Sequence, residues 1–75
     1  MFTATISDIG LSYKADTVAD ISTKLYEYVM ESYGTHTVLN MRDNTVLNSC
    51  KRITSPGEYM ITTKHDNMSI YCIIS

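Results

Sequence analysis

The chain lacks the patterns that mark most nucleotide-binding, zinc-binding and membrane-spanning proteins. Its three glycines, Gly10, Gly34 and Gly57, are isolated, so it has no glycine-rich phosphate loop. Its two cysteines and two histidines show none of the paired spacings of a zinc site. No apolar run is long enough to span a membrane, and the N-terminus lacks a basic region followed by a long apolar segment. We therefore expect no cofactor, no metal, no membrane contact and a cytoplasmic location.

The chain also has few side chains that could form a catalytic group. Cys50 or Cys72 with His36 or His65 are the only nucleophile and base candidates, and the cysteines lie on predicted strands where a buried thiol is usual. We expect two reduced, buried thiols, with one disulfide between neighbouring strands as the alternative. The adjacent pair His65 and Asp66 more simply closes a hairpin. These patterns favour a protein that is not an enzyme.

Length and composition indicate one small folded domain. The 75 residues leave room for a single core and a single domain, residues 1–75, near the size at which stability is marginal. A hydrophobic content of 44% with 19% charged residues argues against a disordered chain. The net charge of −2 is concentrated in the first half, because residues 1–34 carry −3 and residues 35–75 carry +1.

Residues 16–34 give the one continuous helical pattern. At about 100° per residue, one stripe collects Val18, Ile21, Leu25, Val29 and Ser32. Thr17 followed by Asp20 resembles a capping box, with Asp16 as the alternative N-cap, and Gly34 lies where a left-handed C-cap is expected. The sequence therefore predicts one amphipathic helix with defined ends.

The remaining residues predict short strands. Alternating apolar and polar residues mark strands at residues 2–7, 36–41, 45–50 with a continuation through 51–53, 58–64 and 69–75, and a shorter optional one at 11–14. The last strand is apolar on both faces, which favours a central position next to the first strand. The expected fold is α+β: one helix packed on an antiparallel sheet of four to six strands, in the order β(β)αββββ.

Two patches on the helix suggest a protein-binding surface. A solvent-facing row contains Asp20, Glu27 and Glu31, and the edge of the apolar stripe carries Tyr26, Met30 and Tyr33. Carboxylates at these spacings share one side of a helix and could steer a basic protein surface towards it, while Tyr and Met are enriched in interfaces. The alternative is structural: the carboxylates solvate the helix, and each Tyr buries its ring with its hydroxyl in water.

Two other functions stay open. Lys51 and Arg52 with Tyr59 could hold single-stranded nucleic acid on a sheet face, although six basic residues in an acidic chain predict little affinity for nucleic acid. A structural role is also possible, in which the chain forms a homodimer through an open sheet edge.

Composition and expected architecture together resemble a known class. The chain is small, with an acidic helix, and it is rich in Ile, Tyr, Asn, Thr and Met but poor in Ala, Gly, Pro and Arg. In this it resembles phage-encoded host-takeover proteins, including small anti-CRISPR proteins. The resemblance covers the whole chain but includes no motif, so it transfers no functional residue. It implies a stoichiometric inhibitor that occupies a nucleic-acid-binding or subunit-docking surface of a host defence complex.

Overall fold

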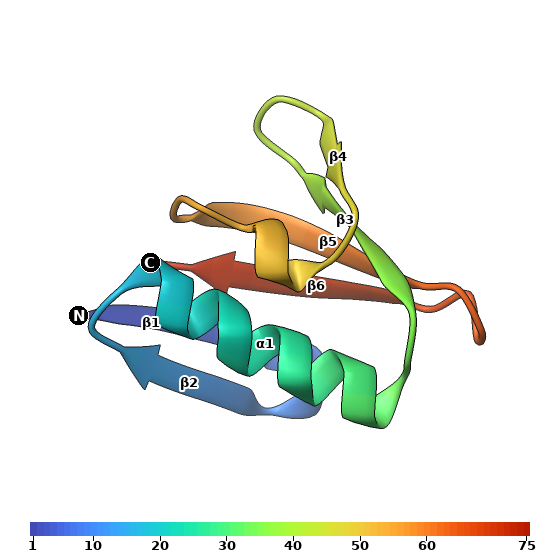
Figure 1. Cartoon of the computed structure of the whole chain (residues 1–75), viewed down its shortest axis with the longest axis horizontal. Helices are drawn as coiled ribbons and strands as arrows, with labels where there is room; N and C mark the ends of the chain where they lie inside the picture. Colours follow the sequence, from blue (N-terminus) through green and yellow to red (C-terminus); the bar gives the residue numbers. More distant parts are fainter.

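The structure, a computed structural model, describes residues 1–75 and contains one helix and one sheet (Figure 1). The elements are β1 (Phe2–Ile6), η1 (Ser7–Ile9), β2 (Leu11–Ala15), α1 (Val18–Ser32), β3 (His36–Asn40), β4 (Thr45–Leu47), η2 (Cys50–Arg52), β5 (Gly57–Thr63) and β6 (Ser69–Ile74). The α+β class is confirmed, and the optional second strand is present.

All six strands form one antiparallel sheet in the order β2-β1-β6-β5-β3-β4. The last strand, β6, lies between β1 and β5, as its two apolar faces predict. The edges are β2 and the three-residue β4. The first and last strands are therefore neighbours near the middle of the sheet.

The helix begins and ends where the sequence predicts. The Oγ1 of Thr17 accepts a hydrogen bond from the backbone N–H of Asp20 at 3.1 Å, which is half of a capping box. Gly34 follows the helix with φ +84°, a left-handed conformation in which a side chain would be strained. Ser32, predicted on the apolar stripe, is exposed, and the buried serine is Ser22. The reason is a specific partner, because the hydroxyl of Ser22 lies 2.6 Å from the carbonyl oxygen of Ile53.

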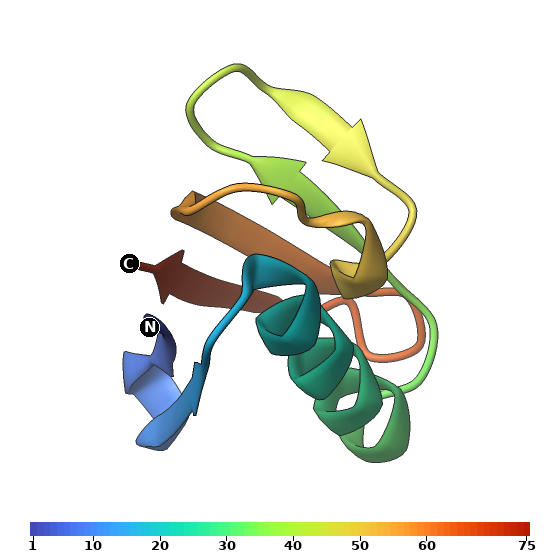
Figure 2. The same ribbon diagram turned by 60° about the vertical axis from the view of Figure 1, so that its left-hand side comes forward.

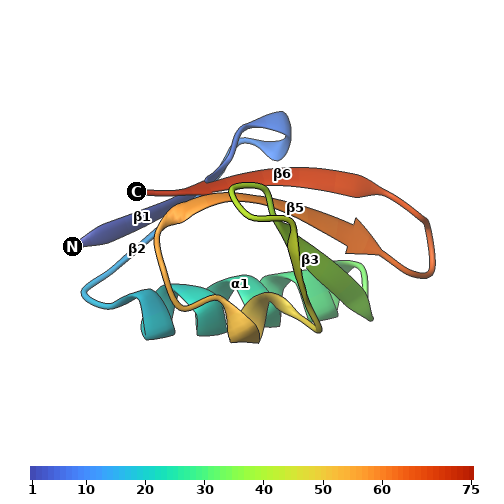
Figure 3. The same cartoon turned by 90° about the horizontal axis from the view of Figure 1, so that it is seen from above.

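The core lies between the helix and one face of the sheet (Figure 3). Strand alternation directs every second side chain towards α1, and those side chains are buried. The main core members are Ala4, Ile6, Ile21, Leu25, Val29, Val38, Tyr59, Ile61, Ile70, Cys72 and Ile74. The opposite face of the sheet is covered by no α-helix; only the short turn η1 lies on that side.

The predicted strand 45–50, with its continuation through 51–53, is wrong beyond Leu47. β4 ends there, and Cys50–Arg52 forms the 3₁₀ turn η2, which lies alongside α1 (Figure 2). Ser49 begins this turn by accepting a hydrogen bond from the N–H of Lys51 at 3.3 Å. Cys50 and Ile53 are buried, at 0% and 2% exposure, so this segment adds core contacts that a longer edge strand would forgo.

Candidate protein-binding surface

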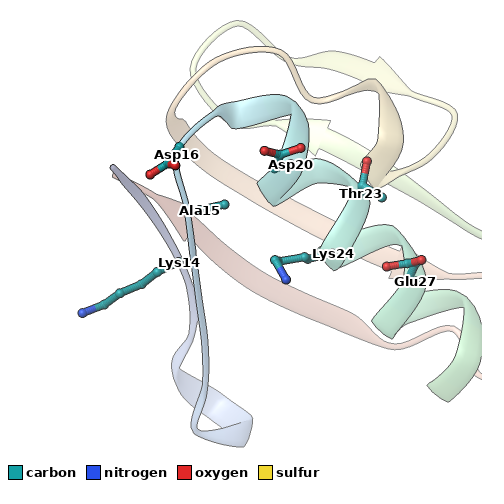
Figure 4. A pocket seen from close by; sticks show the side chains of 7 residues that line it. All are labelled: Lys14, Ala15, Asp16, Asp20, Thr23, Lys24 and Glu27. Atoms are coloured by element: carbon teal, nitrogen blue, oxygen red, sulfur yellow. The ribbon is translucent and has the colours of Figure 1, made fainter.

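The acidic side of the helix forms one wall of an open groove (Figure 4). The groove is about 490 Å³ and runs between α1 and the end of β2 and its following residues. Its lining residues are Lys14, Ala15, Asp16, Asp20, Thr23, Lys24 and Glu27, and of these the side chain of Lys14 points away from the helix (Figure 4). The predicted residues Asp20 and Glu27 are thus brought together, with Asp16 added from the segment before the helix.

The carboxylates on this side face solvent. Asp20, Glu27 and Glu31 are all exposed, as the helical pattern predicts. The only close contact between an acidic and a basic side chain lies elsewhere, between the His65 ring and Asp66 at 3.8 Å, and it is an ion pair only when His65 is protonated. No lysine or arginine makes an ion pair with the row, although Lys24 lines the same groove, and the three carboxylates leave a net negative charge there for an approaching cation.

Tyr26 and Met30 border a second hollow on the next side of the helix. It measures about 190 Å³, and its walls also include His36 and Ser49. Tyr26 is half-buried, with its ring centroid 6.0 Å from that of His36 and 5.1 Å from the Lys51 Nζ. Met30 is 38% exposed, so an apolar surface remains open beside the acidic row.

Tyr33 does not lie with these two residues, which corrects the predicted grouping. Its ring packs edge-on against Tyr28, with centroids 6.2 Å apart, and Tyr28 packs in the same way against Tyr13 at 6.3 Å. The sequence wheel assumes helical geometry at residue 33, but Tyr33 is the C-cap with φ −131° and ψ −20°. Its side chain therefore joins the side of the helix that faces β2. Hydrogen bonding with Tyr28, followed by burial, raises the pKa of Tyr33.

The predicted nucleic-acid face is not formed. Tyr59 is only 1% exposed, because it lies opposite Cys72 on the helix side of the sheet, and its hydroxyl donates to the Ser55 carbonyl at 2.6 Å. Tyr71 is on the other side, where its hydroxyl donates to the carboxylate of Glu58. Lys51 and Arg52 are exposed on η2, where they line a hollow of about 430 Å³ without an aromatic ring. No base could therefore stack on Tyr59 beside these cations.

Two buried polar residues organise this region: His36, which the sequence analysis considers only as a catalytic base, and Ser22, which it does not consider. His36 is 1% exposed, and its Nδ1 lies 3.0 Å from the Gly34 carbonyl while its Nε2 accepts the N–H of Cys50 at 3.1 Å. Ser22 links the helix to the carbonyl of Ile53. Both positions carry a signal in the sequence. His36 is in the same alternation phase as Val38, and Ser22 lies four residues after Val18 and seven before Val29, on the apolar side of the helix.

The two cysteine thiols lie in the core and have low reactivity. Cys50 and Cys72 are free and buried, as expected. Burial raises the pKa of the Cys50 thiol to about 12 and that of the Cys72 thiol to about 11. No three His, Cys, Asp or Glu side chains are grouped so that they could hold a metal ion. The single long helix falls short of the length and apolarity needed to cross a bilayer.

Comparison with known proteins adds no assignment. No family model, curated protein or solved structure matches this chain.

Proposed function

We propose that this chain is a non-enzymatic protein-binding module that attaches to a basic surface through the outer side of α1. One observation carries the proposal: Asp20, Glu27 and Glu31 are exposed along one side of a capped helix, and none has a cationic partner. Such a row attracts a basic protein over distances up to the Debye length, about 8 Å at physiological salt.

The neighbouring hollow supplies the apolar part of the contact. Charged residues on an interface rim mainly set the association rate, whereas a buried apolar anchor slows dissociation. Tyr26 and Met30 lie beside the acidic row and border a hollow large enough for one side chain, about 190 Å³. The expected partner therefore presents lysines or arginines around one protruding apolar residue.

The resemblance to small anti-CRISPR proteins extends this proposal to a biological role. A basic surface that normally holds nucleic acid or docks a subunit is a suitable target for an acidic helix. We propose that the partner is such a surface on a host defence complex and that the chain inhibits it stoichiometrically. This role needs no catalytic group.

Affinity capture with matched charge variants tests the proposal. Wild-type protein, Glu27→Lys, Glu31→Lys and the double variant would each be used as bait in a host lysate, and retained proteins would be identified by mass spectrometry. Asp8→Lys is the matched control, because Asp8 is exposed on η1, outside the groove and the hollow.

The expected result is a basic partner that the wild type and Asp8→Lys both retain. The double variant should bind this partner at least ~10-fold more weakly at low salt, and the difference should shrink as salt is raised. Equal capture by the double variant and the wild type would show that the helix surface is not the contact.

A further inference from the structure

The side of the sheet opposite the helix carries no α-helix, and we call it the bare face. Both α1 and η2 lie on one side, and the turn at η1, which joins β1 to β2 and contacts β6, rises on the other side (Figure 3). A sheet that carries a layer on one side only leaves alternate side chains of every strand in contact with solvent. The chemistry of those side chains decides what can cover them.

An apolar row crosses four neighbouring strands on this bare face. The strand registers place Val46 opposite Leu39, Leu39 opposite Met60, and Met60 opposite Tyr71. Val46 is 67% exposed. Ile73, two residues after Tyr71 on β6, adds a further exposed apolar side chain to the same face. A continuous apolar row of this kind is unusual on a monomer surface, where exposed apolar side chains are usually scattered.

The rest of the bare face carries hydroxyls and no net charge. Alternation places on it one cation, Lys14, and one anion, Glu58, whose carboxylate accepts the hydroxyl of Tyr71. The other side chains there are Thr3, Thr5, Ser12, Thr37, Thr62 and Ser69. The strand residues of this face are therefore suited to a neutral, moderately apolar surface that leaves room for η1.

We propose that the bare sheet face is a homodimer interface, in which the same face of a second copy packs against it and both helices point outward. Two sheets packed face to face lie about 10 Å apart, with their strands crossing at about −30°. The row from Val46 to Tyr71 would meet its two-fold equivalent, so each apolar side chain would be covered by apolar atoms of the partner.

Charge and area favour a second copy as the occupant. Among the strand residues of the bare face, the single cation Lys14 balances the single anion Glu58, so two copies of these strands meet without an excess of like charge; Asp8 lies beside them on η1. The molecule measures 32 × 25 × 19 Å, and one broad side of such a body holds about a fifth of the total 4545 Å², about 900 Å². A standard interface buries roughly 800 Å² on each partner.

Pairing through the open edge of β2 is the competing arrangement, and the structure shows how to separate the two. Thr3 exchanges both backbone hydrogen bonds with Ser75, at 2.7 and 2.8 Å, so alternation directs the backbone groups of Ala4 towards Tyr13. The N–H of Ser12 therefore points away from the sheet, and Ser12→Pro removes an edge donor without breaking a bond to β1. Ser12 is on the bare face, but β1 separates its strand from the strands that carry the apolar row.

Sedimentation velocity from low micromolar to several hundred micromolar protein tests the proposal. The wild type, Met60→Lys, Met68→Lys and Ser12→Pro would be compared after circular dichroism confirms that each is folded. Met68→Lys is the matched control, since Met68 is 42% exposed in the turn after β5, outside the apolar row. If Met60→Lys does not fold, Val46→Lys replaces it, because that side chain is already 67% exposed.

We expect a concentration-dependent dimer for the wild type, Met68→Lys and Ser12→Pro. Met60→Lys should raise the dimer dissociation constant at least ~100-fold, because its ammonium group would be buried without a partner at the centre of the interface. A wild type that stays monomeric over the whole range overturns the proposal. So does a dimer that persists in Met60→Lys, or one that Ser12→Pro alone disrupts. None of these measurements uses the helix partner, so the dimer and the proposed function can fail separately.

Discussion

Replacing His36 tests how the chain holds the segment between β4 and β5 against the core. The ring is 1% exposed, and both of its nitrogens have partners. The backbone N–H of Cys50 can only donate, so Nε2 is the acceptor and carries no hydrogen. The ring hydrogen is therefore on Nδ1, which donates to the Gly34 carbonyl. The ring is thus neutral, with a fixed tautomer, and it joins the end of the helix to η2.

The cost of losing this ring follows from its two partners. In His36→Leu the N–H of Cys50, a residue with 0% exposure, would be buried without an acceptor, at a cost of about 1–3 kcal/mol. The Gly34 carbonyl is only half-buried, so water can replace its partner and the net loss there is about 1 kcal/mol. The sum, about 2–4 kcal/mol, is a large share of the roughly 4–11 kcal/mol expected for 75 residues.

His36→Gln is the informative control. Its side-chain carbonyl can reach the position of Nε2 and accept from Cys50, so this variant should be about 1–2 kcal/mol more stable than His36→Leu. Urea denaturation followed by circular dichroism measures both variants, and nitrogen chemical shifts of the wild-type ring report the tautomer. A leucine variant as stable as the wild type, or a proton on Nε2, would refute the reasoning.

Three further predictions concern single groups. Ser22→Ala should lower the free energy of unfolding by about 1–2 kcal/mol, because it leaves the buried Ile53 carbonyl without its donor. The control Thr23→Ala loses an exposed hydrogen bond to the Ala19 carbonyl and should change the free energy of unfolding by less than about 0.5 kcal/mol. Urea denaturation compares the two variants. Thr17→Ala removes the acceptor for the Asp20 N–H and should cost about 1 kcal/mol, with Thr54→Ala, at an exposed position outside any helix, as the control. Burial raises the pKa of Cys50 to about 12 and of Cys72 to about 11, so iodoacetamide at pH 8 should modify neither thiol until urea is added, as mass spectrometry would show. Above pH ~9 the unfolded thiols lose protons that the folded protein keeps, so the free energy of unfolding should fall as pH rises. If the free energy of unfolding of Cys50→Ala fell with pH as steeply as that of the wild type, this reasoning would be contradicted.

The helix and most strands were predictable because each has a local signal. Residues 18–32 carry a helical period with a threonine cap and a following glycine, and the strand from residue 69 to 74 alternates apolar side chains. The register between strands was not predictable, since it depends on contacts between distant segments. This is why the sequence could not show that Tyr59 points inward and Tyr71 outward.

The misjudged segment illustrates where local patterns fail. Residues 45–50 alternate like a strand, but buried contacts with His36 and with the core favour a 3₁₀ turn at Cys50. Tyr33 was misplaced for a related reason, because one residue beyond the last helical turn the wheel no longer applies. The acidic row was predictable because it lies wholly within the helix.

The helix and the uncovered strands lie back to back, which gives the molecule two faces that do not compete. A dimer joined through its strands would present two acidic faces pointing in opposite directions, too far apart to grip a single small target together. Each half would capture its own target, and the assembly would grow to two chains with two targets. Light scattering measures the molar mass of the purified complex, and this mass gives the stoichiometry.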